Sequence, residues 1–283
     1  MAFKDLKSLC MTAVATVAVA TAILATPGPS PAANEDKFIV VQSTTSTEAS
    51  GLFDHLLPKF EKMTGIDVRV VAVGTGQAIR NAKNGDGDVL FVHHTPSEFK
   101  FIAEGYGKRR FDVMYNDFII VGPKDDPAGV KGMGSATKAL AKIGNAKAPF
   151  ASRGDDSGTN KKERGLWSIT DIDPKAASGT WYRETGSGMG ATLNTAISMG
   201  AYTLSDRATW LNFQNKGDFE MLVEGDPKLF NQYGVMLVNP DKHPHVRKRM
   251  GQAFIDWLVS AAGQETIGSY EIKGQQAFFP NAR

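Results

Sequence analysis

The segment Ser152–Thr159 (SRGDDSGT) carries side chains that together could bind a small anion. Arg153 supplies a planar guanidinium whose donors match an oxyanion. Ser157 and Thr159 supply hydroxyl donors, and the glycines allow the backbone to approach a ligand closely. A helical pattern follows, and a helix N-terminus offers free N–H groups and a partial positive charge. The alternative is an ordinary capped surface loop, because Ser, Asp and Gly also favour helix caps.

The charged residues next to this arginine have separate predicted roles. Asp155 stands two residues after Arg153, and we expect it to hold the guanidinium in place. Asp156 is predicted to cap the following helix. Lys161 and Lys162 are placed on the solvated face of that helix.

Two more hydroxyl-rich loops follow predicted strands. Thr44–Ser46 comes after the apolar run 38–41, and Gly74–Gln77 comes after the valine-rich run 68–73. Thr45 and Glu48 have capping-box spacing, so a helix is predicted to begin there. Ligands of α/β sheets bind at the carboxyl ends of the strands, where both loops lie. The candidate anion-binding residues are Thr44, Thr45, Ser46, Thr75, Gly76, Arg153, Ser157 and Thr159.

The rest of the chain continues the alternation of strands and helices. Further strands are predicted at 88–92, 118–123 and 233–239, and helices at 139–143, from 190 through 197, and at 250–258. This alternation predicts an α/β fold with parallel strands. The strands at 118–122 and 234–239 are interpreted as two crossings between lobes. The predicted clamshell has residues 34–118 and 239–283 as lobe 1 and residues 119–238 as lobe 2.

The N-terminus has the pattern of a secretory signal peptide, assigned to residues 1–33. Lys4 and Lys7 precede an apolar run over residues 9–25, and small residues follow it. The alternative is a membrane anchor, but the run is Ala/Thr-rich and slightly short for one. The single cysteine, Cys10, lies inside the assigned signal, so the predicted mature protein contains no disulfide. A formal net charge of +2 argues against a nucleic-acid partner.

Several segments together resemble a known family. Arg153-x-Asp155-x-Ser157-Gly158-Thr159 resembles the signature of periplasmic phosphate-binding proteins, and the wider pattern is closer to the tungstate-binding proteins of tungstate ABC importers. The matching segments are Thr44–Ser46, Val73–Ala78, Asp88–His93, Met114–Pro123, Ser152–Thr159 and Tyr202–Arg207.

This resemblance implies a type II periplasmic binding protein fold with two crossing strands and a tetrahedral oxyanion as ligand. It also implies delivery of the ligand to a membrane ABC permease with a cytoplasmic ATPase. We therefore expect a periplasmic, monomeric protein that is not an enzyme and has no cofactor. The family's ligand contacts carried over by the match are Thr44, Ser46, Thr75, Arg153 and Thr159.

The chemistry of the loops favours a fully ionised anion. Tungstate and molybdate carry no proton at neutral pH and need only donors, whereas hydrogen phosphate needs an acceptor. Neither Thr44–Ser46 nor Gly74–Gln77 contains a carboxylate. The preference for tungstate over molybdate rests on the resemblance alone.

His93 and His94 follow a strand, but no cysteine or carboxylate cluster accompanies them. They are therefore interpreted as ordinary loop histidines, and no metal ligand is expected among the protein side chains.

Three alternatives remain open. One is a phosphate- or sulfate-binding protein of the same fold. Another is a secreted hydrolase in which Ser157 or Ser187 is the nucleophile, although no G-x-S-x-G motif is present. The third is an adhesion or signalling module that uses the clamshell as a sensor. Absence of turnover together with one-to-one oxyanion binding would exclude the hydrolase.

Overall fold

Three short parallel strands carry two of the predicted loops at their carboxyl ends. The computed structural model describes residues 37–283. In it β1 (Phe38–Thr44) lies between β2 (Asp67–Val73) and β3 (Val89–Val92) and pairs in parallel with both. The helices that follow these strands are α1 (Thr45–Ala49), α2 (Leu52–Thr64), α3 (Thr75–Asn84) and α4 (Thr95–Ala103).

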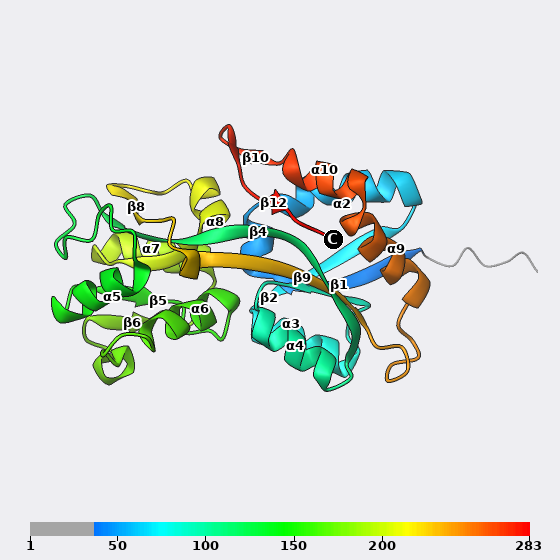
Figure 1. Ribbon diagram of the computed structural model, residues 1–283, viewed down its shortest axis with the longest axis horizontal. Helices are drawn as coiled ribbons and strands as arrows, with labels where there is room; N and C mark the ends of the chain where they lie inside the picture. The colour runs from blue at the N-terminus through cyan, green and yellow to red at the C-terminus, as the bar shows by residue number, and fades with distance from the viewer. Residues whose placement is uncertain (1–36) are drawn as a thin grey trace, which may run out of the picture. The chain divides into compact units, whose positions relative to one another are not determined.

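Two long antiparallel strands extend the sheet away from β1–β3. β9 (Phe230–Val238) pairs with β3 on one side and with β4 (Gly107–Pro123) on the other. Figure 1 shows β4 and β9 side by side, with α2, α3 and α4 near one end of the pair and α5 to α8 near the other. Beyond the part of β4 that pairs with β9, the strand pairs with β7 (Thr203–Asp206) and β8 (Phe219–Val223).

The remaining elements complete the eight-stranded main sheet and two small two-stranded sheets. β5 (Phe150–Ser152) pairs in parallel with β6 (Tyr182–Glu184) and leads directly into Arg153. The other elements are α5 (Ala136–Asn145), α6 (Gly158–Trp167), η1 (Pro174–Ala177), α7 (Met189–Met199), α8 (Arg207–Asn212), η2 (Pro227–Leu229), α9 (Lys248–Val259), α10 (Ala261–Gly268), β10 (Glu271–Ile272), β11 (Gln275–Gln276) and β12 (Phe279–Pro280).

Hydrophobic side chains form three clusters, and both long strands pass between them. Val113 and Met114 of β4 belong to the largest cluster, whereas Phe118–Val121 of the same strand belong to the two smaller ones. Around β9, Leu229 lies in a smaller cluster and Tyr233 in the largest. The hydrophobic interior therefore changes near residues 114–118 and 229–233. The expected lobe boundary at 238/239 lies at the end of β9, after residues that already pack in the largest cluster; the division into lobes stays a prediction.

The α/β architecture predicted from the sequence is confirmed, but its strands are not all parallel, because every pair that involves β4 or β9 is antiparallel. The first helix is capped by Thr44, whose hydroxyl accepts from Thr47 N–H, and not by Thr45. That helical stretch is broken at Gly51, which has a φ of +79° and lies too close to Tyr270 for a side chain. β4 begins at Gly107, well before the predicted residue 118, because pairing with β9 extends it. The predicted signal peptide lies outside the described residues. Within residues 37–283, no helix has the length and apolar character of a membrane span.

Candidate anion-binding site

Helix N-termini converge where the predicted loops meet. α1 begins directly after β1, α3 one residue after β2, and α6 follows the Arg153 loop. Thr44 and Ser157 cap α1 and α6 with their hydroxyls, whereas Gly74 caps α3 without a side-chain bond. Each start leaves backbone N–H groups without intrahelical partners. The folding pattern thus collects donors at one place.

The three candidate loops touch one another directly. The Gly158 N–H donates to Thr75 Oγ1 at 2.8 Å, and the Gly76 N–H donates to Asp156 O at 3.3 Å. Arg153 Nη2 donates to Thr45 Oγ1 at 3.3 Å. Segments more than 70 residues apart in sequence are therefore brought into hydrogen-bonding contact.

Most of the candidate side chains are withdrawn from solvent. Six of the eight candidates are at most 2% exposed, and Thr45 and Gly76 are half-buried. The six buried candidates are Thr44, Ser46, Thr75, Arg153, Ser157 and Thr159. The Thr159 hydroxyl is buried with no hydrogen-bond partner among the described residues. A buried hydroxyl without a partner is costly, so a ligand that accepts from it would be stabilised.

Two glycines allow the close approach of the loops. A Cβ built on Gly76 would lie 1.8 Å from Asp156 Oδ2 and 3.3 Å from Asp156 O. A Cβ on Gly158 would lie 2.9 Å from His93 Cε1 and 3.0 Å from Thr75 Oγ1. A side chain at Gly158 would therefore push against both the β2 and the β3 loops.

Arg153 is the one guanidinium among the candidate residues, and Asp155 orients it. Asp155 Oδ2 accepts from Arg153 Nη2 at 2.6 Å and from Nε at 3.2 Å. Asp155 Oδ1 accepts from Ser157 N–H at 3.2 Å, so the same carboxylate also shapes the loop. Arg153 Nη1 forms no hydrogen bond with the described residues. An oriented guanidinium with a remaining donor suits an oxyanion.

Two charged residues near this loop differ from expectation. Asp156 does not cap α6, because Ser157 does so; Asp156 has a φ of +57° and pairs with Lys161. Lys162 is not on a solvated face, since its Nζ donates to Lys228 O at 3.0 Å and Phe230 O at 2.9 Å. Burial lowers the pKa of Lys162. Packing of α6 against η2 and the start of β9 explains this, and local spacing could not reveal it.

His93 is a site residue that the sequence analysis interpreted as an ordinary loop histidine. It is 4% exposed, and its Nε2 lies 3.0 Å from Ser46 Oγ and 3.2 Å from Thr44 Oγ1. Its Nδ1 lies 3.1 Å from Asn231 Oδ1, and its ring stacks on Tyr233. The available signal was its place directly after β3, which shares its carboxyl edge with β1.

Two buried titratable groups next to the site have shifted pKa values. Burial lowers the pKa of His93 to about 4, and the charge of Arg153 acts in the same direction, so the ring is neutral at pH 7. Burial raises the pKa of Asp206, while its bonds with Thr209 and the charge of Arg153 oppose the rise. Asp206 caps α8 through Oδ1 and its Oδ2 has no partner among the described residues. Asp206 is a buried carboxyl group beside the site that the sequence analysis did not foresee.

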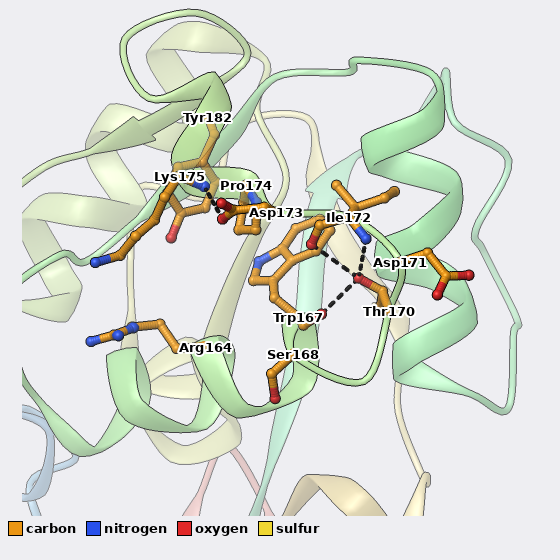
Figure 2. Close-up of a pocket in the computed structure, with 10 residues that line it drawn as sticks. All are labelled: Arg164, Trp167, Ser168, Thr170, Asp171, Ile172, Asp173, Pro174, Lys175 and Tyr182. Carbon is orange, nitrogen blue, oxygen red and sulfur yellow. Dashed lines mark hydrogen bonds between the residues drawn. The ribbon is translucent and has the colours of Figure 1, made fainter.

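A separate cavity of about 470 Å³ lies beside the C-terminal end of α6. Figure 2 shows Trp167 in its middle, with Arg164 and Lys175 on one side and Asp171 on the other. None of the eight candidate residues lines it.

A buried carboxyl group ties α6 to the strand that leads into Arg153. Ser152 and Tyr182 each donate a hydrogen bond to Glu163 at 2.7 Å. Burial raises the pKa of Glu163 to about 7.

A metal site formed by protein side chains is not visible in the described part of the chain. Residues 37–283 contain no group of three or more His, Cys, Asp and Glu side chains arranged to hold a metal ion. What the loops offer is a set of donors around one buried cation.

The chain is similar to one family model and to several known proteins. Residues 25–262 match the family model of the PBP superfamily domain. The tungstate-binding protein TupA of Peptoclostridium acidaminophilum is 48% identical over 248 residues, which cover 86% of each chain. The structure of the tungstate-binding protein TupA from Desulfovibrio alaskensis G20 superposes with a TM-score of 0.75 at 44% identity, covering 87% of this chain and 99% of that one. The crystal structure of the tungstate ABC transporter from Geobacter sulfurreducens superposes with a TM-score of 0.76 at 46% identity, covering 84% of this chain and 100% of that one.

Proposed function

Because this chain belongs to the PBP superfamily, in the family of the TupA tungstate-binding proteins, we propose that it binds tungstate and delivers it to an ABC importer. The observation that carries the proposal is the buried Arg153, which is oriented by Asp155 and donates to the Thr45 hydroxyl of the opposite loop. A dianion in a water-excluded site needs such a positive charge. The eight candidate residues are the proposed contacts, with Asp155 acting through Arg153.

A thermal-shift screen tests this proposal. At 100 times the dissociation constant, a ligand adds about 2.7 kcal/mol to the free energy of unfolding. We expect tungstate, and molybdate to a similar degree, to raise the melting temperature by roughly 5–10 °C. A clear rise with phosphate and none with either metal oxyanion would contradict the proposal.

The two long strands support a hinged binding mechanism. The hydrophobic interior changes along β4 near residues 114–118 and around β9 near residues 229–233, so few side chains of one part pack within the other. The hydroxyl loops lie on the β1–β3 side and Arg153 on the other, so a ligand between them would favour closure. Small-angle scattering should give a smaller radius of gyration with saturating tungstate than without. An unchanged profile would count against closure.

The proposal includes the route and place of action. The assigned signal at residues 1–33 would export the chain, and its partners would be the oxyanion and a membrane permease. The proposal includes no cofactor, because the loops themselves supply the donors that an oxyanion needs. Detection of the protein in a periplasmic extract, with residues 1–33 missing by mass spectrometry, tests this part.

A hydrolase is the second candidate, since Ser46, His93 and Asn231 have the order of a nucleophile, a base and an orienting group. Three observations weaken it. An amide in place of the acid lowers kcat by about 10⁴-fold in serine proteases. A histidine with a pKa of about 4 is a weak base at neutral pH. Ser46 is only 1% exposed. Covalent labelling of Ser46 by a fluorophosphonate would support the hydrolase.

A further inference from the structure

Four of the candidate hydroxyls accept a hydrogen bond from within the protein. A hydroxyl has one proton and two lone pairs, so one that accepts internally can still direct its proton toward a ligand. The hydroxyls and their internal donors are Thr44 with Thr47 N–H at 3.3 Å, Thr45 with Arg153 Nη2 at 3.3 Å, Thr75 with Gly158 N–H at 2.8 Å, and Ser157 with Asn160 N–H at 3.1 Å.

Ser46 depends on His93 for the same arrangement. The hydroxyl of Ser46 lies 3.0 Å from His93 Nε2 and 3.1 Å from Thr44 Oγ1. If Nε2 carries the imidazole proton, it donates to Ser46 and leaves the serine proton for the ligand. If Nε2 is bare, Ser46 or Thr44 must donate to it, and that oxygen then faces the ligand as an acceptor.

The proton position on His93 is set by the buried amides behind it. In one orientation of the two amides, Asn231 presents Oδ1 to His93 Nδ1 and donates from Nδ2 to Asn116 Oδ1 at 2.7 Å. This orientation leaves Asn116 Nδ2 and Tyr233 Oη buried without partners among the described residues. Burial and the nearby charge of Asp206 raise the pKa of Tyr233, and the polar side chains of Thr47, Asn231 and Asn116 near its hydroxyl oppose the rise.

A half-turn of both amides removes these unpaired groups. The oxygen and nitrogen of a side-chain amide exchange places on such a turn without a change of shape. Tyr233 then donates to Asn116, Asn116 donates to Asn231, and Asn231 donates to His93 Nδ1. Nδ1 becomes the acceptor, and the proton of the neutral ring lies on Nε2.

We propose that His93 is a positioning residue that determines which protonation state of the anion the site accepts. The chain Tyr233–Asn116–Asn231 keeps the His93 proton on Nε2, which donates to Ser46, so that the Ser46 proton points at the ligand. The site then offers donors only at this position, and a protonated anion such as hydrogen phosphate finds no acceptor there. This inference rests on the proposed oxyanion function.

Nitrogen NMR of the ring tests the inference without any ligand. In protein with ¹⁵N-labelled histidine at neutral pH, the His93 signals, assigned with His93→Gln, should show a protonated Nε2 and a bare Nδ1. His94→Gln is the control for the neighbouring ring. A protonated Nδ1 would overturn the inference and leave tungstate binding untouched, so failure of the inference can be distinguished from failure of the function.

A matched pair of anions tests its consequence. At about pH 8 sulfate and phosphate are both dianions of similar size, and only phosphate carries a proton. In Asn231→Asp the new carboxylate offers only acceptors to His93 Nδ1. The proton of the neutral His93 ring then moves to Nδ1, and Nε2 is left without a proton. The ratio of sulfate to phosphate affinity should then fall by at least about tenfold. The added negative charge weakens the binding of both dianions to the same degree, so the charge alone does not change this ratio.

The charge control is Gln232→Glu on the same strand. Gln232 donates to Met114 O and lies outside the Tyr233–Asn116–Asn231 chain. This variant should leave the affinity ratio as in the wild type. An equal fall of the ratio in both variants, or no fall in Asn231→Asp, would contradict the inference. If Asn231→Asp does not fold, the ring NMR of the wild type decides alone.

Discussion

The two sides of the candidate site differ in charge. The hydroxyl side, formed by Thr44, Thr45, Ser46, Thr75 and Gly76 after β1 and β2, contains no ionised group. The arginine side, formed by Arg153, Asp155, Ser157 and Thr159 after β5, contains an ion pair between the buried Arg153 and the half-buried Asp155. A charge provides attraction for any dianion, whereas neutral donors in fixed directions discriminate between anions of equal charge. The comparison implies that affinity is controlled from the arginine side and selectivity from the hydroxyl side.

The largest expected effect comes from removing the charge. Arg153→Ala leaves the dianion with neutral dipoles only, and truncating one partner of a buried charge pair typically costs about 2–5 kcal/mol. We expect a loss of tungstate affinity of roughly thirty-fold to several thousand-fold, measured by titration calorimetry. Arg153→Lys should also lose affinity, because a point charge does not replace the planar fork.

Arg183→Ala, at an exposed position of β6, is the charge-matched control and should bind like the wild type. If Arg153→Ala binds within about three-fold of the wild type, under about 1 kcal/mol, the site lies elsewhere and the contrast between the two sides is wrong.

A smaller effect is expected on the hydroxyl side. Thr75→Val keeps the shape of the side chain but removes both the donor to the ligand and the acceptor for the Gly158 N–H. Hydrogen bonds to charged groups contribute about 1.5–3 kcal/mol, so tungstate affinity should fall about ten- to a hundred-fold. Thr75→Ser retains the hydroxyl and should stay near the wild type. Equal affinities of Thr75→Val and Thr75→Ser would show that this hydroxyl does not contact the ligand.

The smallest effect concerns stability on the arginine side. Glu163 has a pKa of about 7 in the folded protein because of burial, against an ordinary 4.5. Between these values the folded state holds the proton and the unfolded state does not, so stability decreases as pH rises from about 4.5 to about 7. The contribution is about 1.4 kcal/mol for each unit by which the two pKa values differ.

Glu163→Gln should flatten this pH dependence of the melting temperature, whereas Glu271→Gln, at an exposed position, should not. The contradicting result is a melting temperature of the wild type that rises between pH 4.5 and 7 and has the same slope in Glu163→Gln. Glu163 would then not be a protonated, buried carboxyl behind Arg153.

Local sequence patterns predicted the strands and loops because these depend on short-range spacing. The apolar run before Thr44 and the glycines around Thr75 gave β1 and the start of α3, and Ser152–Thr159 gave the loop before α6. The role of His93 was missed, since its burial depends on Asn231, which lies 138 residues further along the chain. The bonding of Lys162 to the first residue of β9 was missed for the same reason.

The central claim is that each chain binds one fully ionised tetrahedral oxyanion between the hydroxyl side and the arginine side. Titration calorimetry of the mature protein with tungstate, molybdate, sulfate and phosphate at one pH tests it most directly. We predict one-to-one binding of tungstate and molybdate, much weaker binding of sulfate, and the weakest binding of phosphate. Tightest binding of phosphate, or no binding of either metal oxyanion, would contradict the claim.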